Sequence, residues 1–183
     1  ERTMYTHLGV SSELSIQDIN HAVIKDSEYL LVEGYLVTSE ETQKVANYSL
    51  DIANEYGVKK IITLSDPNVV KFFRANILEL LNKSFDIIFC NKQEALNISM
   101  CNNIDDAIDF LRKYAYEIII TSGEDGAYVT VGNEKVHEFP DKVEPVDLTG
   151  AGDMFLAAYV FAKMSNKVLS DRIKFANTCS GNV

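Results

Sequence analysis

Two patterns of apolar residues alternate along the chain. Short apolar runs bounded by turn residues are followed by longer stretches in which apolar side chains return every three or four positions. The first pattern is typical of buried strands and the second of amphipathic helices. The predicted strands cover residues 29–35, 60–64, 85–90 and 117–121. The predicted helices cover 16–23, 39–56, 67–82, a short segment after 91, 104–116, 151–163, and a segment from 168 that is still helical at 183.

The regular alternation of strands and helices predicts an α/β fold, because parallel strands need a crossover connection between them. The predicted strands are apolar throughout, so helices should cover both faces of the sheet. The alternation stops at residues 127–131 and 134–139, two short strands joined by Gly132-Asn133, which favours a hairpin. We therefore expect a mostly parallel sheet with an antiparallel hairpin at one edge.

Composition and charge narrow the class of protein. The 183 residues, 46% of them hydrophobic, are enough for a single compact domain over 1–183. The formal net charge of -10 argues against nucleic-acid binding, which requires excess Lys and Arg. No apolar run reaches the ~20 residues that span a bilayer, so we expect no membrane insertion. Cys90, Cys101 and Cys179 lack metal or disulfide spacing, which is typical of reduced thiols in the cytoplasm.

The segment Thr149-Gly150-Ala151-Gly152-Asp153 lies where a predicted loop becomes a helix. Small residues let the first backbone amides of a helix approach an anion, and the helix dipole favours negative charge there. The same field keeps Asp153 ionised, and an ionised carboxylate can accept a proton from an attacking hydroxyl. A plain helix start, with Asp153 as partner of the dipole, remains an alternative. Phe155 breaks the dinucleotide-binding fingerprint, and the chain has no Gly-Lys-Ser/Thr phosphate loop.

The longer run Asp147-Leu148-Thr149-Gly150-Ala151-Gly152-Asp153-Met154-Phe155 resembles the C-terminal signature of the PfkB, or ribokinase-like, family of carbohydrate and nucleoside kinases. That signature reads Asp-(Thr/Ser)-Thr-Gly-Ala-Gly-Asp-x-Phe, and only Leu148 departs from it. The resemblance implies that Asp153 is the catalytic base and that the amides of Gly150, Ala151 and Gly152 form an anion hole. It also implies a monovalent-cation site, with K⁺ as the candidate ion, at Asp147 and Thr149, which Leu148 weakens.

Two further segments resemble motifs of the same family, in the same order. Asn91-Lys92-Gln93-Glu94 resembles an Asn-x-x-Glu motif that places Mg²⁺ and phosphate, largely through water. Taken alone, Asn91 and Glu94 also suit a helix cap and its capping-box partner. Thr121-Ser122-Gly123-Glu124-Asp125-Gly126 resembles a loop beside ATP, and the alternative is a plain turn into the hairpin.

The two ends of the chain carry weaker similarities. The segment from Glu1 through Arg2 to Gly9 resembles one in adenosine kinases and related sugar kinases that places an Arg near the phosphates, although a terminal Arg is often simply solvated. Asn177 falls where the last helix of the family lines the adenine pocket, and simple packing is the alternative. Together these similarities imply a ribokinase-like three-layer α/β/α sandwich, closest to the adenosine-kinase-like branch.

The resemblance implies an enzyme that uses ATP and Mg²⁺ to phosphorylate a hydroxymethyl group of a nucleoside or sugar, as a monomer or homodimer. The alternatives are a ribokinase- or fructokinase-type sugar kinase, a non-catalytic nucleotide-binding relative and, more remotely, a dinucleotide-dependent oxidoreductase. The chain lacks an initiator Met, a Gly-Gly-Asn substrate motif, a β-sheet lid and the family's final cation ligands. We therefore expect a piece of a longer enzyme that holds the nucleotide half of the active site.

Overall fold

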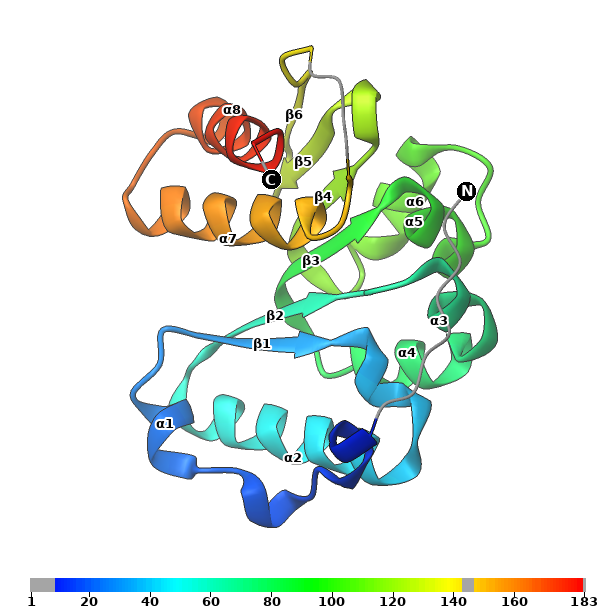
Figure 1. The fold of residues 1–183 in the computed structure, drawn as a ribbon, viewed down its shortest axis with the longest axis vertical. Helices are drawn as coiled ribbons and strands as arrows, with labels where there is room; N and C mark the ends of the chain where they lie inside the picture. The colour runs from blue at the N-terminus through cyan, green and yellow to red at the C-terminus, as the bar shows by residue number, and fades with distance from the viewer. Residues whose placement is uncertain (1–8, 143–146, 183) are drawn as a thin grey trace.

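Residues 9–142 and 147–182 are described by a computed structural model, and they form one six-stranded sheet with helices on both faces (Figure 1). The strands lie side by side in chain order. The first four are parallel, and each of the last two is antiparallel to the strand before it. They are β1 (Tyr29–Glu33), β2 (Lys59–Thr63), β3 (Phe85–Asn91), β4 (Ala115–Thr121), β5 (Ala127–Val131) and β6 (Glu134–Glu138). The predicted α/β fold with a hairpin edge is confirmed.

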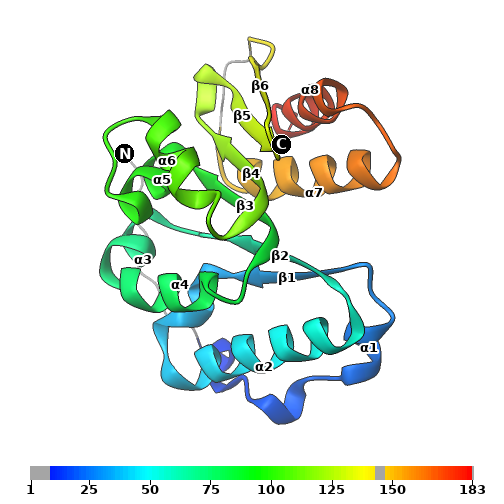
Figure 2. The ribbon, with the colours of Figure 1, turned by 180° about the vertical axis from the view of Figure 1, so that it is seen from behind.

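The helices form two layers, which Figures 1 and 2 show on either side of the sheet. One layer contains α2 (Glu40–Tyr56), α3 (Pro67–Phe72), α4 (Arg74–Leu81), α5 (Lys92–Ser99) and α6 (Ile104–Leu111). The other contains α7 (Ala151–Met164) and α8 (Leu169–Ser180). Short α1 (His21–Lys25) packs on α2 through the cluster Ile24, Ile52, Ala53 and Val58. The 3₁₀ turns of the described residues are η1 (Gly9–Glu13), η2 (Ile16–Asp18), η3 (Gly34–Thr38) and η4 (Gly123–Asp125).

The three layers follow from the alternation of side chains along each strand. Successive strand residues point to opposite faces. Ile62 and Ile88 therefore join the core beneath α2–α6, whereas Ile61 and Ile87 join the core beneath α7 and α8. Because both faces are covered, the central strands are apolar on both sides, as the sequence indicated.

Several predicted boundaries are corrected by the structure. The predicted helix 16–23 is a 3₁₀ turn capped by Ser15 followed by α1, because Asn20 starts a second helix by accepting a hydrogen bond from the Ala22 amide. The predicted helix 67–82 divides at Phe73, which leaves helical geometry at φ −115° and ψ 28°. Phe73 and Ile77 both pack on the same core, so the apolar spacing continues across the break.

Other predicted elements are shorter than expected. The first strand ends at Glu33 rather than residue 35, because the chain turns into η3 at Gly34. Glycine is needed there, since a Cβ at Gly34 would lie 2.6 Å from the Leu64 carbonyl oxygen. The helix at 104–116 ends at Leu111, because the following residues join the sheet. The last helix ends at Ser180 with Gly181 as its C-cap residue, so the expectation that this helix continues beyond residue 180 is wrong. Residue 183 lies outside the described residues.

Candidate active site

The carboxyl ends of the parallel strands surround a cavity of about 240 Å³. In an open parallel sheet this edge is where ligands bind, since the polar residues after each strand converge there. We call it the site cavity. Its lining residues are Glu33, Tyr35, Thr63, Ser65, Phe89, Asn91, Glu94, Thr121, Gly152 and Asp153. Five of them come from three motifs that lie far apart in the sequence, and the fold brings them together: Asn91, Glu94, Thr121, Gly152 and Asp153.

The glycine turn forms the start of α7. Gly150 is its N-cap residue and has φ 83°, a left-handed conformation that favours glycine. A Cβ added at Gly152 would come no closer than 4.0 Å to Phe89, so the backbone there faces open space. The first amides of a helix have no partner within the helix and carry its positive dipole end. This 14-residue helix therefore directs a field suited to an anion toward the cavity.

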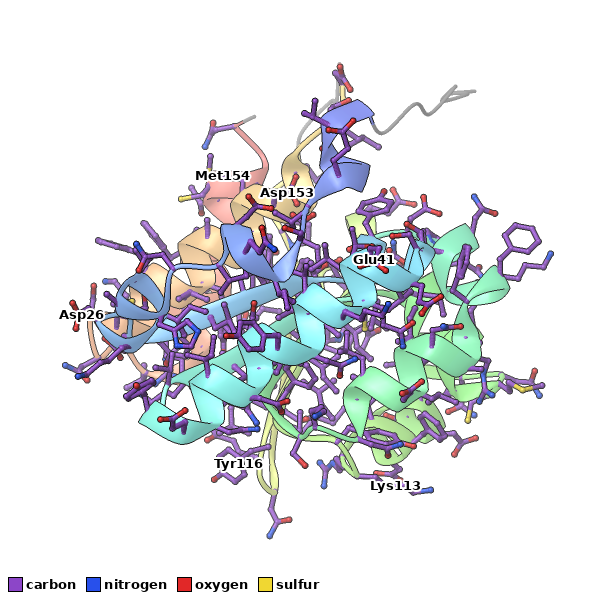
Figure 3. All side chains as sticks on the ribbon, turned by 90° about the horizontal axis from the view of Figure 1, so that it is seen from below. Asp26, Glu41, Lys113, Tyr116, Asp153 and Met154 are labelled. Carbon is purple, nitrogen blue, oxygen red and sulfur yellow. The ribbon has the colours of Figure 1, made fainter. Side chains whose placement is uncertain are left out.

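Asp153 lies in the first turn of α7 with an exposed side chain at the site cavity. Figure 3 shows it beside Met154 at one end of the molecule. The stacked rings of Phe89 and Phe155 attach this turn to β3. The carboxylate is thus held on a rigid helix while remaining accessible to a ligand.

Asn91 and Glu94 cap helix α5 in the reciprocal manner of a capping box. The Glu94 amide donates to the Asn91 Oδ1 atom at 2.9 Å, and the Asn91 amide donates to Glu94 Oε2 at 2.9 Å. The Asn91 side-chain amide donates to Glu94 Oε1 at 2.6 Å. The helix cap that these two residue types suit is therefore present. Both residues nevertheless line the cavity, so the cap and a ligand-binding role are compatible.

Glu94 is a buried carboxylate, only 4% exposed. Burial raises the pKa of Glu94 to about 7, the Asn91 amide opposes that rise, and the nearby Asp66 carboxylate adds to it. The pKa of Tyr35 is raised, first by burial and then by the nearby carboxylates Asp66, Glu94, Glu33 and Asp153. The cavity thus gathers negative charge around a phenol that remains protonated near neutral pH.

This charge fits a divalent cation, although no cluster of three or more His, Cys, Asp or Glu side chains able to hold a metal is found in residues 9–142 and 147–182. Mg²⁺ often retains several water molecules and takes its remaining ligands from one or two carboxylates and a nucleotide phosphate. The donors present at Asn91 and Glu94 match that mode of binding. They fit Mg²⁺ held through water and do not form a closed protein cage.

The second glycine motif forms the loop between β4 and β5. Thr121 lines the cavity, whereas Gly123 and Gly126 do not contribute to its lining. Gly126 has φ 83°, and a Cβ there would lie 2.1 Å from the Glu138 carbonyl oxygen. The Lys92 ammonium lies 3.6 Å from Asp125 Oδ2, which links this loop to the start of α5. The loop is therefore a tight turn into the hairpin that is also tied to the Asn91 motif.

The remaining candidate residues are spread more widely. The Thr149 amide and hydroxyl donate to Asp147 Oδ1 at 2.9 and 2.6 Å, so these two residues are adjacent to each other before the glycine turn. Asn177 is buried on α8 and donates to the Glu138 carbonyl oxygen at 3.4 Å, and it does not line the site cavity. Arg2 lies outside the described residues.

Five lining residues were not predicted from the sequence: Glu33, Tyr35, Thr63, Ser65 and Phe89. Glu33 and Thr63 are the last residues of β1 and β2, so the rule that ligands bind at carboxyl ends of parallel strands could have found them. Tyr35 and Ser65 had no comparable signal. Their positions depend on backbone turns after the strands, including the left-handed conformation of Ser65 at φ 70°.

Comparison with known proteins agrees with the fold and the family resemblance. The model of the pfkB family carbohydrate kinases matches residues 1–183, and the chain therefore belongs to the PfkB family. Among solved structures, adenosine kinase from Sinorhizobium meliloti is similar with a TM-score of 0.86 and 32% identity, over 92% of this chain and 52% of that one. Ribokinase of Staphylococcus aureus (strain COL) is 29% identical, over 98% of this chain and 58% of its own length.

A putative ribokinase II from E. coli, solved in complex with ATP and Mg²⁺, has a TM-score of 0.85. At 24% identity, over 93% of this chain and 56% of that one, it supports the fold alone. The chain spans about half the length of the relatives it matches. Among the helices of the described residues, none has both the length and the apolar character needed to cross a membrane.

Proposed function

We propose that the protein carrying this chain transfers the γ-phosphoryl group of ATP to a hydroxymethyl group of a nucleoside or sugar. One observation carries the proposal: Asp153 and Gly152 at the start of α7 share a cavity with Asn91, Glu94 and Thr121. An anion-binding helix start, a carboxylate and polar groups suited to hydrated Mg²⁺ are the parts that phosphoryl transfer needs. Membership of a kinase family supports the same reading.

In this mechanism Asp153 is the general base. It accepts the proton of the acceptor hydroxyl as that oxygen attacks the γ-phosphorus. A bond forms between the acceptor oxygen and phosphorus, the bond from phosphorus to the β,γ-bridging oxygen breaks, and ADP leaves. The amides of Gly150, Ala151 and Gly152 lie at the positive end of α7 and would stabilise the negative charge on the transferring group. The Ala151 amide also donates to the Leu148 carbonyl at 3.3 Å.

The other motif residues are assigned to the nucleotide and its ions. Asn91 and Glu94 would hold Mg²⁺ through water, and the bound ion would neutralise charge on the phosphates. Thr121, with the turn formed by Gly123 and Gly126, borders the nucleotide. We further assign Asn177 and Arg2 to the nucleotide, and Asp147 and Thr149 to a monovalent cation such as K⁺.

The acceptor is proposed to contain a ribose-like ring that carries the hydroxymethyl group. The comparisons include both an adenosine kinase at 32% identity and a ribokinase at 29% identity. We take a nucleoside as the first candidate and a free sugar as the alternative. A panel of nucleosides and sugars tested with the full-length protein distinguishes them by kcat/KM. A cytoplasmic setting remains part of the proposal, supported by three cysteines that form no disulfide.

The decisive test compares Asp153→Asn with Asp171→Asn in the full-length protein. Asp171 is a matched control, because it is also an exposed acid in the first turn of a helix, α8. Loss of the base should lower kcat by about 10²–10⁴-fold, the usual range for general-base catalysis, while ATP still binds. Asp171→Asn should retain wild-type turnover. Near-normal turnover by Asp153→Asn would refute the role of Asp153, and an absence of ATP consumption by the wild-type protein would favour a non-catalytic nucleotide-binding relative.

A further inference from the structure

A second hollow, of about 430 Å³, lies at the edge of the sheet opposite the site cavity, where β3 and β4 begin and β5 turns into β6. We call it the basal hollow. Figure 3 shows Lys113 and Tyr116, two of its residues, at the opposite end of the molecule from Asp153. Its lining residues are Ser84, Phe85, Arg112, Lys113, Tyr114, Ala115, Tyr116, Gly132 and Asn133. None of them belongs to the candidate active site.

The charge of the basal hollow is opposite to that of the whole chain. Its lining contains two cations, Arg112 and Lys113, and no carboxylate, whereas the chain has a formal net charge of -10. The nearest acidic partner of Arg112 is Asp109, whose Oδ1 lies 3.9 Å from Arg112 Nε. Lys113 lies over the Phe110 ring at 5.3 Å and forms no ion pair with any described carboxylate. Both cations can therefore turn toward an anion without breaking a close salt bridge.

Neutral hydrogen-bond donors accompany these charges. Among the lining residues, Ser84, Tyr114 and Tyr116 carry hydroxyl groups, and Asn133 carries a side-chain amide. A phosphate dianion has three strong acceptor oxygens, and an Arg guanidinium fits it bidentately. The lining residues thus carry several donors suited to one phosphate group, and none of them is a carboxylate.

The three segments that form the hollow are held together by backbone bonds. The Phe85 amide donates to the Tyr114 carbonyl at 2.8 Å, and the Gly132 amide donates to the Tyr116 carbonyl at 3.1 Å. A Cβ at Gly132 would lie 2.9 Å from the Tyr116 hydroxyl oxygen, so glycine permits the ring to lie against the hairpin turn. Tyr116 is nonetheless 68% exposed. The site is preformed, with a flat ring at its rim.

We propose that the basal hollow binds a phosphate dianion carried on a small metabolite, at a site separate from the nucleotide in the site cavity. The basal hollow is an open surface depression of about 430 Å³, wide enough to admit a small metabolite. Arg112 and Lys113 bind the phosphate oxygens, and the exposed Tyr116 ring packs on the rest of the ligand. This inference does not depend on the proposed kinase reaction.

The experiment is an NMR titration of the ¹⁵N-labelled full-length protein, with a non-hydrolysable ATP analogue and Mg²⁺ present at saturation so that the nucleotide part of the active site is already filled. Inorganic phosphate and AMP are the two probes. Saturable shifts should appear at the amides of Tyr116, Gly132 and Asn133. The paired change Arg112→Gln and Lys113→Gln should weaken binding at least ~10-fold, because each lost charged hydrogen bond contributes more than a neutral one.

The matched control is the pair Lys71→Gln and Lys167→Gln, which removes the same charge from exposed lysines elsewhere. It should leave the affinity for both probes unchanged. Equal weakening of binding by both variant pairs would show only non-specific attraction of an anion to positive charge, and the proposal would be wrong. Amide shifts that do not saturate would lead to the same conclusion. A preserved spectrum outside the hollow shows that the Arg112 and Lys113 variant is folded. If the double variant is not folded, the single variant Lys113→Gln should still bind both probes less tightly than the wild type does.

The two probes distinguish the source of the phosphate. Tighter binding of AMP, lost in Tyr116→Leu, identifies a phosphate carried on a flat organic group and supports the proposal in full. Equal binding of phosphate and AMP contradicts the metabolite part of the proposal, because it identifies a site for the bare ion. Absence of saturable binding by both probes contradicts the whole proposal.

Discussion

The rings of Phe89 and Phe155 stack with their centroids 6.0 Å apart and their planes 22° from parallel. Phe89 lies two residues before Asn91, and Phe155 lies two residues after Asp153. Both phenylalanines are buried. Their contact therefore sets the position of the proposed base relative to the proposed Mg²⁺ motif across more than 60 residues of sequence.

The first prediction concerns this contact. Phe155→Ala should lower the free energy of unfolding by about 3–5 kcal/mol, the usual range for truncating a buried Phe. It should also lower kcat, because the start of α7 loses its attachment to β3. Phe72→Ala, at a position 73% exposed, should change stability by less than about 1 kcal/mol. Chemical denaturation and steady-state kinetics measure the two effects. Unchanged kcat in a folded Phe155→Ala variant would argue against a positioning role for this contact.

A second prediction follows from the pKa of Glu94, which is raised to about 7 in the folded protein. Between pH 4.5 and about pH 7, the folded state binds more protons at Glu94 than the unfolded state does. The contribution of Glu94 to the free energy of unfolding therefore falls as pH rises. The stabilisation is fully present below pH 4.5 and is lost as pH rises through about 7. The difference in unfolding free energy between wild type and Glu94→Gln should fall by roughly 3 kcal/mol across this window.

The measurement is urea denaturation at several pH values in the presence of a chelator. Glu41→Gln is the control, since Glu41 also lies in the first turn of a helix but its side chain is 67% exposed. Glu41→Gln should not reproduce the pH dependence expected for Glu94→Gln, because burial does not act on an exposed side chain. A flat difference for Glu94→Gln would show that the carboxylate does not take up a proton in this range.

The third prediction separates the two roles of Asn91. Asn91→Ala removes the cap of α5 and should lower stability by about 1 kcal/mol, whereas Asn91→Ser retains a capping side chain and should lower it by less. Both variants lose the amide proposed to help position hydrated Mg²⁺. Both should therefore require more Mg²⁺ for half-maximal activity, measured by a Mg²⁺ titration at fixed ATP. A wild-type Mg²⁺ requirement in Asn91→Ser would leave the cap as the only role of Asn91.

The fourth prediction tests the link between Lys92 and Asp125, 3.6 Å apart. Their side chains are 49% and 59% exposed, so the ion pair should add little to overall stability. Asp125→Asn should instead raise KM for ATP by ~2–5-fold, the effect of losing up to about 1 kcal/mol of loop ordering. Exchange of the charges in Lys92→Asp with Asp125→Lys should restore part of the affinity. An exchanged protein no better than either single variant would contradict the link.

The fifth prediction compares two glycines of one loop. A Cβ at Gly126 would meet the Glu138 carbonyl oxygen at 2.1 Å, whereas a Cβ at Gly123 would meet nothing within 4 Å. Both have positive φ, so both alanine variants should be strained by about 1–2 kcal/mol. Gly126→Ala should lower the melting temperature well beyond Gly123→Ala, because β6 must also move. Equal melting temperatures would contradict this account of the turn.

Much of the fold was predictable from local pattern. Apolar runs located all four parallel strands, and Gly132-Asn133 located the hairpin, because these signals depend on residues that are neighbours in the chain. The breaks at Asn20 and Phe73 were not predictable, since the apolar spacing continues through them. Whether a helix continues or restarts there depends on capping and packing against other elements.

The sequence by itself determined the three motifs, their order and the family resemblance that the comparisons confirm. It left the role of Asn91 and Glu94 open between a helix cap and an ion site. Only the tertiary structure brought these residues to one cavity with Asp153, added Glu33 and Tyr35, and left Asn177 outside its lining. The reason is physical: a motif records the chemistry of neighbouring residues, whereas the distance between motifs and the pKa of Glu94 depend on how strands and helices pack.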